Sequence, residues 1–180
     1  SLITSTVENQ AVFYIEIKAR SDRHDHIRAI LRSKNARQVG LDHQIDTYFN
    51  VSEGRLKLRE GNIENSLIFY SRSNQAGPKR SDVVLYKLVP DPALKEVLSA
   101  SNGVLVVVDK QREIWFVENV KLHLDVVHEL GTFVEIEAID ADGSHTEDAL
   151  REQCDAWIEL LGIQPEDLID RSYSDLLMDA

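Results

Sequence analysis

Charged side chains alternate with apolar ones along several short stretches of this sequence. Residues 13–20 carry Glu16 and Lys18 between Phe, Ile and Ala residues, and residues 55–59 carry Arg, Lys and Arg between two leucines. Glu135 and Glu137 stand two positions apart in an otherwise apolar segment. Side chains two positions apart share a face of a β-strand, so each segment is expected to have one charged and one apolar face.

The chemistry of these faces depends on where they point. One charged face is equally well explained by contact with water, but here basic residues lie on one face of at least five expected strands. If the strands close into a barrel, these faces can line a water-filled lumen. Crowded cations repel one another unless a polyanion neutralises them, and clustered carboxylates favour Mg²⁺ or Mn²⁺. A phosphate chain meets both requirements.

The elements that would position these residues follow from the hydrophobic pattern. Period-two alternation broken by turn residues predicts strands over 12–20, 44–51, 55–60, 66–72, 83–89, 104–117, 120–127 and 132–139. Helices are expected over 23–35 with Ser21 and Asp22 as caps, over 92–98 with Asp91 as cap, over 144–161, from Pro165 and over 172–177. Barrel closure removes exposed sheet edges. We therefore predict an α+β fold, an eight-stranded antiparallel β-barrel with flanking helices.

Composition limits the partners. The 180 residues include 20 Lys and Arg against 31 Asp and Glu, a net charge of −11, which argues against nucleic acid or an anionic membrane as a partner. No apolar run approaches the roughly 18 residues of a membrane span, and the one cysteine, Cys154, forms no internal disulfide. We expect a cytoplasmic protein, monomeric or homodimeric, with a flexible leader over 1–10 and one domain over 11–180.

Several motifs together resemble the CYTH family, also called triphosphate tunnel metalloenzymes. The string Tyr14-Ile-Glu16-Ile-Lys18 is similar to the opening E-x-E-x-K strand of that family, and 130–137, Leu-Gly-Thr-Phe-Val-Glu-Ile-Glu, is similar to its last strand. Residues 44–49 and 54–59 resemble the second and third strands, and 67–82 resembles members labelled class IV adenylyl cyclase. The resemblance covers about residues 13–177 and implies an eight-stranded tunnel.

The resemblance also implies roles for individual residues. It assigns Glu16, Glu135 and Glu137 to a metal, Mg²⁺ or Mn²⁺, and Asp125 to a tunnel acid that assists a second metal or a water. The basic residues that match the triphosphate clasp are Lys18, Lys57, Arg59, Arg72, Lys87 and Arg112. Lys110 and Lys121 fall on the same lumen-facing positions. We expect Lys18, Arg59 and Asp125 to act in catalysis. Tyr14 departs from the pattern, since it replaces the first glutamate.

The expected function is hydrolysis of a small linear triphosphate, inorganic or organic, by a metal-dependent enzyme. The alternative is a class IV adenylyl cyclase that converts ATP to cyclic AMP and pyrophosphate, favoured by residues 70–82. A second alternative, prompted by Tyr14, is a non-catalytic module that binds polyphosphate or a nucleotide. His123 and His128 are interpreted as structural or surface residues rather than catalytic ones.

Overall fold

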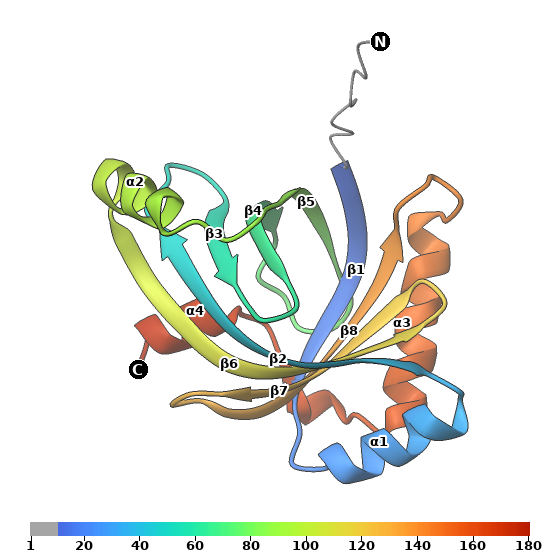
Figure 1. Ribbon diagram of the computed structural model, residues 1–180. Coiled ribbons are helices and arrows are strands. Elements are labelled where there is room, and N and C mark those ends of the chain that lie inside the picture. Colours follow the sequence, from blue (N-terminus) through green and yellow to red (C-terminus); the bar gives the residue numbers. More distant parts are fainter. Residues whose placement is uncertain (1–10) are drawn as a thin grey trace.

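Eight antiparallel strands close into a barrel, which confirms the predicted fold class (Figure 1). The computed structural model describes residues 11–180, so the leader expected over 1–10 lies outside the described residues. The strands are β1 (Ala11–Arg20), β2 (Arg37–Phe49), β3 (Arg55–Glu60), β4 (Asn65–Arg72), β5 (Lys79–Lys87), β6 (Val104–Val117), β7 (Val120–Val127) and β8 (Gly131–Asp140). Their spatial order is β5-β4-β3-β2-β6-β7-β8-β1, and pairing of β1 with β5 closes the barrel.

Strand β1 holds the closure together because both of its edges are paired. One edge pairs with β8 over residues 13–20. The other edge pairs with β5 over residues 11–16 and then with the two-residue strand β9 (Leu168–Ile169), which meets Lys18 and Ala19. In this way both edges of β1 are covered along most of its length.

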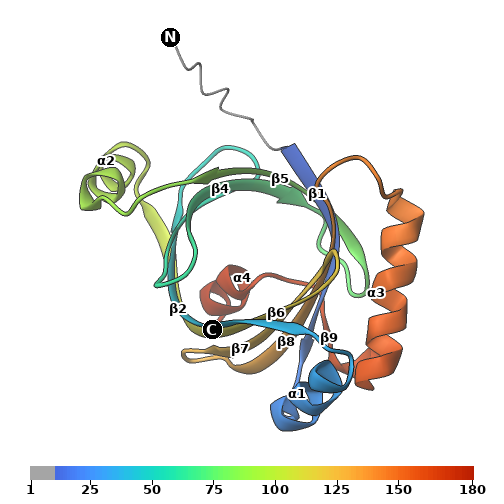
Figure 2. The ribbon, with the colours of Figure 1, turned by 45° about the vertical axis from the view of Figure 1, so that its right-hand side comes forward.

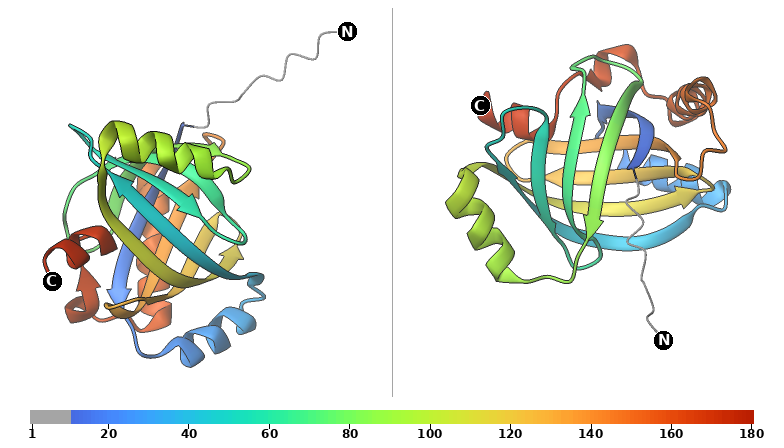
Figure 3. Two further views of the ribbon diagram at one scale, coloured as in Figure 1. Left: turned by 60° about the vertical axis from the view of Figure 1, so that its left-hand side comes forward. Right: turned by 90° about the horizontal axis from the view of Figure 1, so that it is seen from above.

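The helices cover the outside and one end of the barrel. They are α1 (His24–Ser33), α2 (Pro92–Asn102), α3 (Glu147–Leu161) and α4 (Tyr173–Met178), with a short 3₁₀ turn over Pro165–Asp167. Figure 3 shows α1 and α2 at opposite sides of the barrel. In Figure 2, which looks along the bore, α4 projects into the outline of the barrel. No helix within 11–180 is long and apolar enough to cross a bilayer.

The main apolar core lies outside the barrel wall. Ile15 and Ile17 of β1 and Leu122 of β7 pack with Leu150 and Cys154 of α3, and all five side chains are buried. Because side chains alternate along a strand, the charged positions of β1 and β7 then face the lumen. This wall is therefore apolar outside and charged inside, the reverse of a small barrel whose interior is packed with side chains.

Two strand predictions were too short at their N-terminal ends. β2 begins at Arg37 instead of residue 44, since a register shift between Gln38 and Gly40 lets an irregular, polar segment keep pairing with β6. β5 begins at Lys79 instead of residue 83 because Lys79 and Ser81 pair with β1. β2 and β5 also end two residues early, at Phe49 and Lys87.

Two helices begin later than predicted. Neither Ser21 nor Asp22 caps α1; its N-cap is Arg23, because the backbone of Ser21 is still bonded to Thr132 of β8. α3 begins at Glu147 after an N-cap at Thr146, because Asp142 holds Ser144 in the preceding turn. The cap of α2 at Asp91 is confirmed, and this helix continues to Asn102.

Candidate active site

A cavity of about 460 Å³ runs inside the barrel and is lined by residues from all eight strands. Eleven of the twelve residues predicted from the sequence line it, namely Glu16, Lys18, Lys57, Arg59, Arg72, Lys87, Lys110, Arg112, Lys121, Glu135 and Glu137. The twelfth, Asp125, is buried behind Arg112. Within residues 11–180, eight Lys and Arg but only four Glu line the cavity, so its charge is positive although the chain carries −11.

One side of the cavity, which we call the cation wall, gathers three cations around a single carboxylate. Arg59 donates to both oxygens of Asp46 at 2.9 and 2.8 Å, and Lys110 Nζ donates to Oδ2 at 2.7 Å. Lys57 Nζ lies 3.4 Å from the same oxygen. Burial alone would raise the pKa of Asp46, but Arg59, Lys110 and Lys57 hold it well below its usual range. Asp46 fixes the three cations, and Arg59 Nη1 also lies 3.6 Å from Glu64 Oε1. The three cations still outnumber these two carboxylates.

Lys110 is the most deeply buried of these three cations. Burial lowers its pKa to about 7, and the nearby charges of Arg112, Arg59 and Lys57 act in the same direction against the opposing effect of Asp46. An anionic ligand beside Lys110 would stabilise its protonated form.

Arg112 is held in place by Asp125. Its Nε and Nη2 donate to the two Asp125 oxygens, both at 2.8 Å, and the hydroxyl of Tyr173 donates to Oδ2 at 2.7 Å. Both oxygens of Asp125 therefore accept hydrogen bonds from protein groups. The catalytic role expected for Asp125 stays a prediction, while its contact fixes the orientation of Arg112.

The opposite side, which we call the acidic wall, carries Glu16, Glu135, Glu137 and His123. Glu16 of β1 lies directly across from Glu137 of β8, and Lys18 lies across from Glu135. Lys18 Nζ lies 3.4 Å from Glu135 Oε1, and Arg72 forms an ion pair with Glu16. Burial opposes ionisation of Glu135, but Arg112 and Lys18 hold its pKa well below the usual range. Glu135 is therefore ionised at neutral pH.

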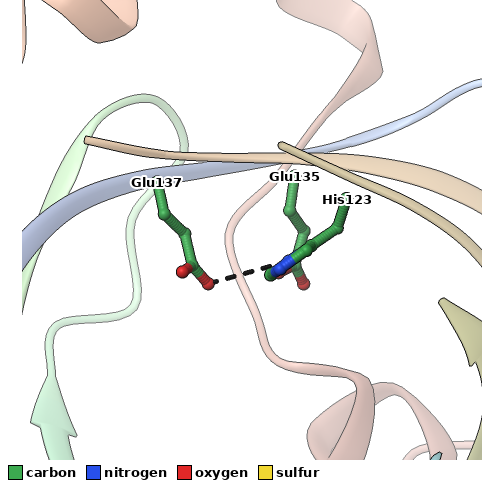
Figure 4. Close-up of side chains that lie close together, drawn as sticks. All are labelled: His123, Glu135 and Glu137. Carbon is green, nitrogen blue, oxygen red and sulfur yellow. Dashed lines mark hydrogen bonds and ion pairs between the residues drawn. The ribbon is translucent and has the colours of Figure 1, made fainter. Parts of the chain in front are cut away.

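His123 is a site residue that sequence reasoning missed. Its side chain is only 1% exposed and lines the cavity, so the interpretation as a surface residue is wrong. Nδ1 lies 3.3 Å from Glu135 Oε2 and 3.8 Å from Glu137 Oε1 (Figure 4). Burial and Arg112 lower the pKa of His123. The sequence did indicate this position, because His123 lies on the same face of its strand as Lys121 and Asp125.

Further residues in or beside the cavity carried weaker sequence signals. Asp46 stands between Ile45 and Thr47 and has no charged neighbour two residues away. Glu64 precedes β4 in a turn, where it binds Lys121 at 2.6 Å and Gln44 at 3.0 Å. Lys79, expected in a loop, is buried. Burial, then Arg72 and Lys18, lower the pKa of Lys79 to about 8.

The residues of the acidic wall fit a divalent cation. Donor atoms of His123, Glu135 and Glu137 all lie within 4.8 Å of one another. Glu16 is next to them by register. Tyr14, which replaces the first glutamate of the family motif, also lines the cavity, and burial and Glu137 raise the pKa of its hydroxyl. Tyr14 therefore stays neutral and supplies no carboxylate.

Apolar side chains also line the cavity. Ile63, Leu85, Leu88 and Ile139 line it together with Lys87, which is exposed. Arg20, at the far end of β1, is exposed and donates to the Leu130 carbonyl outside the cavity lining. Anionic groups would therefore bind among the buried cations, and an apolar group would bind near Leu85.

Solved structures share this architecture. The conserved hypothetical protein Pfu-838710-001 from Pyrococcus furiosus is 25% identical, with a TM-score of 0.76 over 91% of this chain and 99% of that chain. A candidate adenylate cyclase from Vibrio parahaemolyticus is 22% identical, with a TM-score of 0.74 over 94% and 99%. HpAC1 from Hippeastrum, a candidate adenylyl cyclase with a dominant triphosphatase activity, is 16% identical, with a TM-score of 0.62 over 93% and 94%.

The comparison with curated proteins gives no significant match. The family model of the CYTH domain matches residues 13–173, which include every barrel strand except the first two residues of β1. The chain therefore belongs to the CYTH family.

Proposed function

We propose that this protein is a metal-dependent phosphohydrolase that cleaves a small linear triphosphate inside the barrel. The observation that carries the proposal is the charge of the cavity, where eight Lys and Arg face four Glu. Adding the buried acids Asp46 and Asp125 still leaves more cations than carboxylates. Burying unbalanced like charges is costly, so a polyanionic ligand is the partner that stabilises this arrangement.

The two walls suit the two needs of phosphoryl transfer, which are positioning and charge stabilisation. Arg59 and Arg112 present planar guanidinium groups in orientations fixed by Asp46 and Asp125, and Lys18, Lys57 and Lys110 add point charges. Glu16, Glu135 and Glu137 would hold Mg²⁺ or Mn²⁺, which would draw charge from the phosphate oxygens. Because the cations lie on several strands, they can contact successive phosphates of one chain.

The nucleophile decides between two reactions. Attack of water on the terminal phosphorus gives hydrolysis, whereas attack of a ribose 3′-hydroxyl on the α-phosphorus gives cyclic AMP and pyrophosphate. The apolar residues Leu85, Leu88 and Ile139 favour the second candidate, a class IV adenylyl cyclase, because they offer a surface for a base. We prefer hydrolysis, since a triphosphate fills the charged region without that surface, and the structurally similar HpAC1 has a dominant triphosphatase activity.

A panel of substrates tests the proposal. Inorganic triphosphate, thiamine triphosphate and ATP are incubated with Mg²⁺ or Mn²⁺, and all products are separated. We expect orthophosphate from triphosphate. Cyclic AMP with pyrophosphate from ATP would establish the cyclase instead, and tight triphosphate binding without turnover would establish a binding module. Cytoplasmic location and the choice between monomer and homodimer stay predictions.

A further inference from the structure

The acidic wall contains one nitrogen donor among its carboxylates. His123 of β7 lies directly across from Glu135 of β8, and the next facing pair is Lys121 and Glu137. His123 Nδ1 lies 3.3 and 3.8 Å from oxygens of the two glutamates (Figure 4). These separations are close to the distances between neighbouring ligands around a first-row metal ion, whose bonds to nitrogen and oxygen are about 2.0–2.2 Å long.

The oxygen donors of this wall are fewer than the strand motif would provide. Tyr14 supplies a neutral phenol where the family motif has a carboxylate, and Glu16 is already paired with Arg72. Glu135, Glu137 and His123 form the group on this wall, among the described residues, whose possible ligand atoms all lie within 4.8 Å of one another. The second nitrogen of His123, Nε2, is buried without a hydrogen-bond partner among the described residues.

We infer that His123 is a metal ligand beside the glutamates of the acidic wall, so that the cation site of the tunnel contains a nitrogen donor and prefers Mn²⁺ and other transition-metal ions to Mg²⁺. This inference rests on the proposed function only in placing a metal on the acidic wall. Mg²⁺ is bound through oxygen ligands and retained water, whereas imidazole favours transition metals. A buried imidazole beside two glutamates would therefore raise the affinity of the site for metal ions and also shift its selectivity from Mg²⁺ towards Mn²⁺.

A competing explanation is that His123 serves only as a hydrogen-bond donor to the glutamates. Arg112 Nη2 already lies 3.3 Å from the same Glu135 oxygen that faces Nδ1, so this oxygen has a second donor. In that case a bound ion would contact carboxylate oxygen and water alone. The two explanations differ in whether nitrogen is bonded to the ion, which spectroscopy detects directly.

Pulsed EPR of Mn²⁺ bound to the purified protein without substrate tests the inference. We expect a ¹⁴N coupling of a directly bound imidazole in the wild type. The coupling should be lost in His123→Gln. The matched control is His145→Gln, because His145 belongs to the other group of possible ligands in the described chain, with Asp140 and Asp142. The coupling should persist in that variant.

Metal titrations by calorimetry give a second measurement. His123→Gln should lower Mn²⁺ affinity by about tenfold or more and change Mg²⁺ affinity much less, while His145→Gln should change neither. Absence of ¹⁴N coupling in the wild type, or its loss in His145→Gln, would overturn the inference even if His123→Gln does not fold. Turnover is not used, so failure here is distinct from failure of the proposed hydrolysis.

Discussion

The cation wall consists mainly of Lys and Arg side chains, and the acidic wall consists mainly of glutamates. On each wall, side chains of the opposite charge hold these groups in place. On the cation wall one carboxylate, Asp46, fixes Arg59, Lys110 and Lys57. On the acidic wall Lys18 and Arg112 lie against Glu135. Arg72 pairs with Glu16 as well, so Glu137 is the glutamate of the acidic wall that has no Lys or Arg partner among the described residues.

The difference in charge between the two walls indicates which ligand each wall requires. A wall with excess cations favours an anion, and a wall with excess carboxylates favours a cation. A phosphate chain together with a divalent ion neutralises both walls at once, whereas either ligand alone leaves one wall unbalanced. We therefore expect substrate and metal to bind more tightly together than separately, and substitutions on the two walls to affect different steps.

The largest expected effect comes from removing the charge of the acidic wall. Glu135→Gln together with Glu137→Gln keeps the shape of both side chains but removes the carboxylates that would hold the metal. Loss of hydrogen-bond partners to metal ligands already costs about 10- to 100-fold, so we expect kcat for triphosphate hydrolysis to fall by about 100-fold or more. The measurement is kcat at saturating Mn²⁺.

Glu129→Gln is the matched control for that double substitution. Its side chain is about 70% exposed on the turn between β7 and β8, and this variant should retain wild-type turnover. Undiminished turnover of the double variant at saturating metal would show that the acidic wall does not bind the catalytic ion.

A smaller effect is expected from the cation wall. Arg59→Ala removes a guanidinium, while Lys57 and Lys110 still neutralise Asp46, so the barrel should remain folded. A hydrogen bond to a charged group contributes about 1.5–3 kcal/mol, so triphosphate binding should weaken by about 10- to 100-fold. Calorimetric titration with triphosphate in the absence of metal measures the contribution of this wall to binding. The affinity of Arg59→Lys for triphosphate should lie between those of the wild type and Arg59→Ala, because lysine keeps the positive charge but lacks the paired N–H donors of a guanidinium.

Arg80 provides the control for the arginine substitution. It pairs with Asp82 on the outside of the barrel, and Arg80→Ala should leave the affinity for triphosphate unchanged. Equal affinities of Arg59→Ala and the wild type would place the substrate away from the cation wall.

The residues of the two walls were largely predictable from the sequence, because side chains alternate between the two faces of a β-strand. Alternation identified which face of β1, β3 and β8 is charged, and closure into a barrel then brought those faces together. Eleven of the twelve predicted site residues therefore line one cavity although no two distant strands were paired in advance.

Other features depended on register, which alternation does not determine. Asp46 organises the cation wall because it lies directly across from Arg59, and His123 joins the acidic wall because it lies across from Glu135. Local sequence shows the face of each residue but not the residue opposite to it. Lys79 was missed for a different reason, since its strand begins beside a Gly-Pro turn and is extended by pairing with β1.

The smallest effect, a dependence on pH, should also distinguish the walls. Burial lowers the pKa of Lys110 to about 7, so this lysine is charged below pH 7 and increasingly neutral above it. Triphosphate favours the charged form, and binding above pH 7 must therefore take up a proton. Metal-free affinity should weaken severalfold between pH 7 and pH 8.5 in the wild type.

The substitution Lys110→Arg should reduce that decline in affinity, because a guanidinium stays protonated over this range. Calorimetry of inorganic triphosphate at several pH values compares the two proteins, and ionisation of the ligand itself affects both equally. Identical slopes for wild type and Lys110→Arg would show that Lys110 keeps its proton throughout. The cation wall would then bind its anion with a fixed charge.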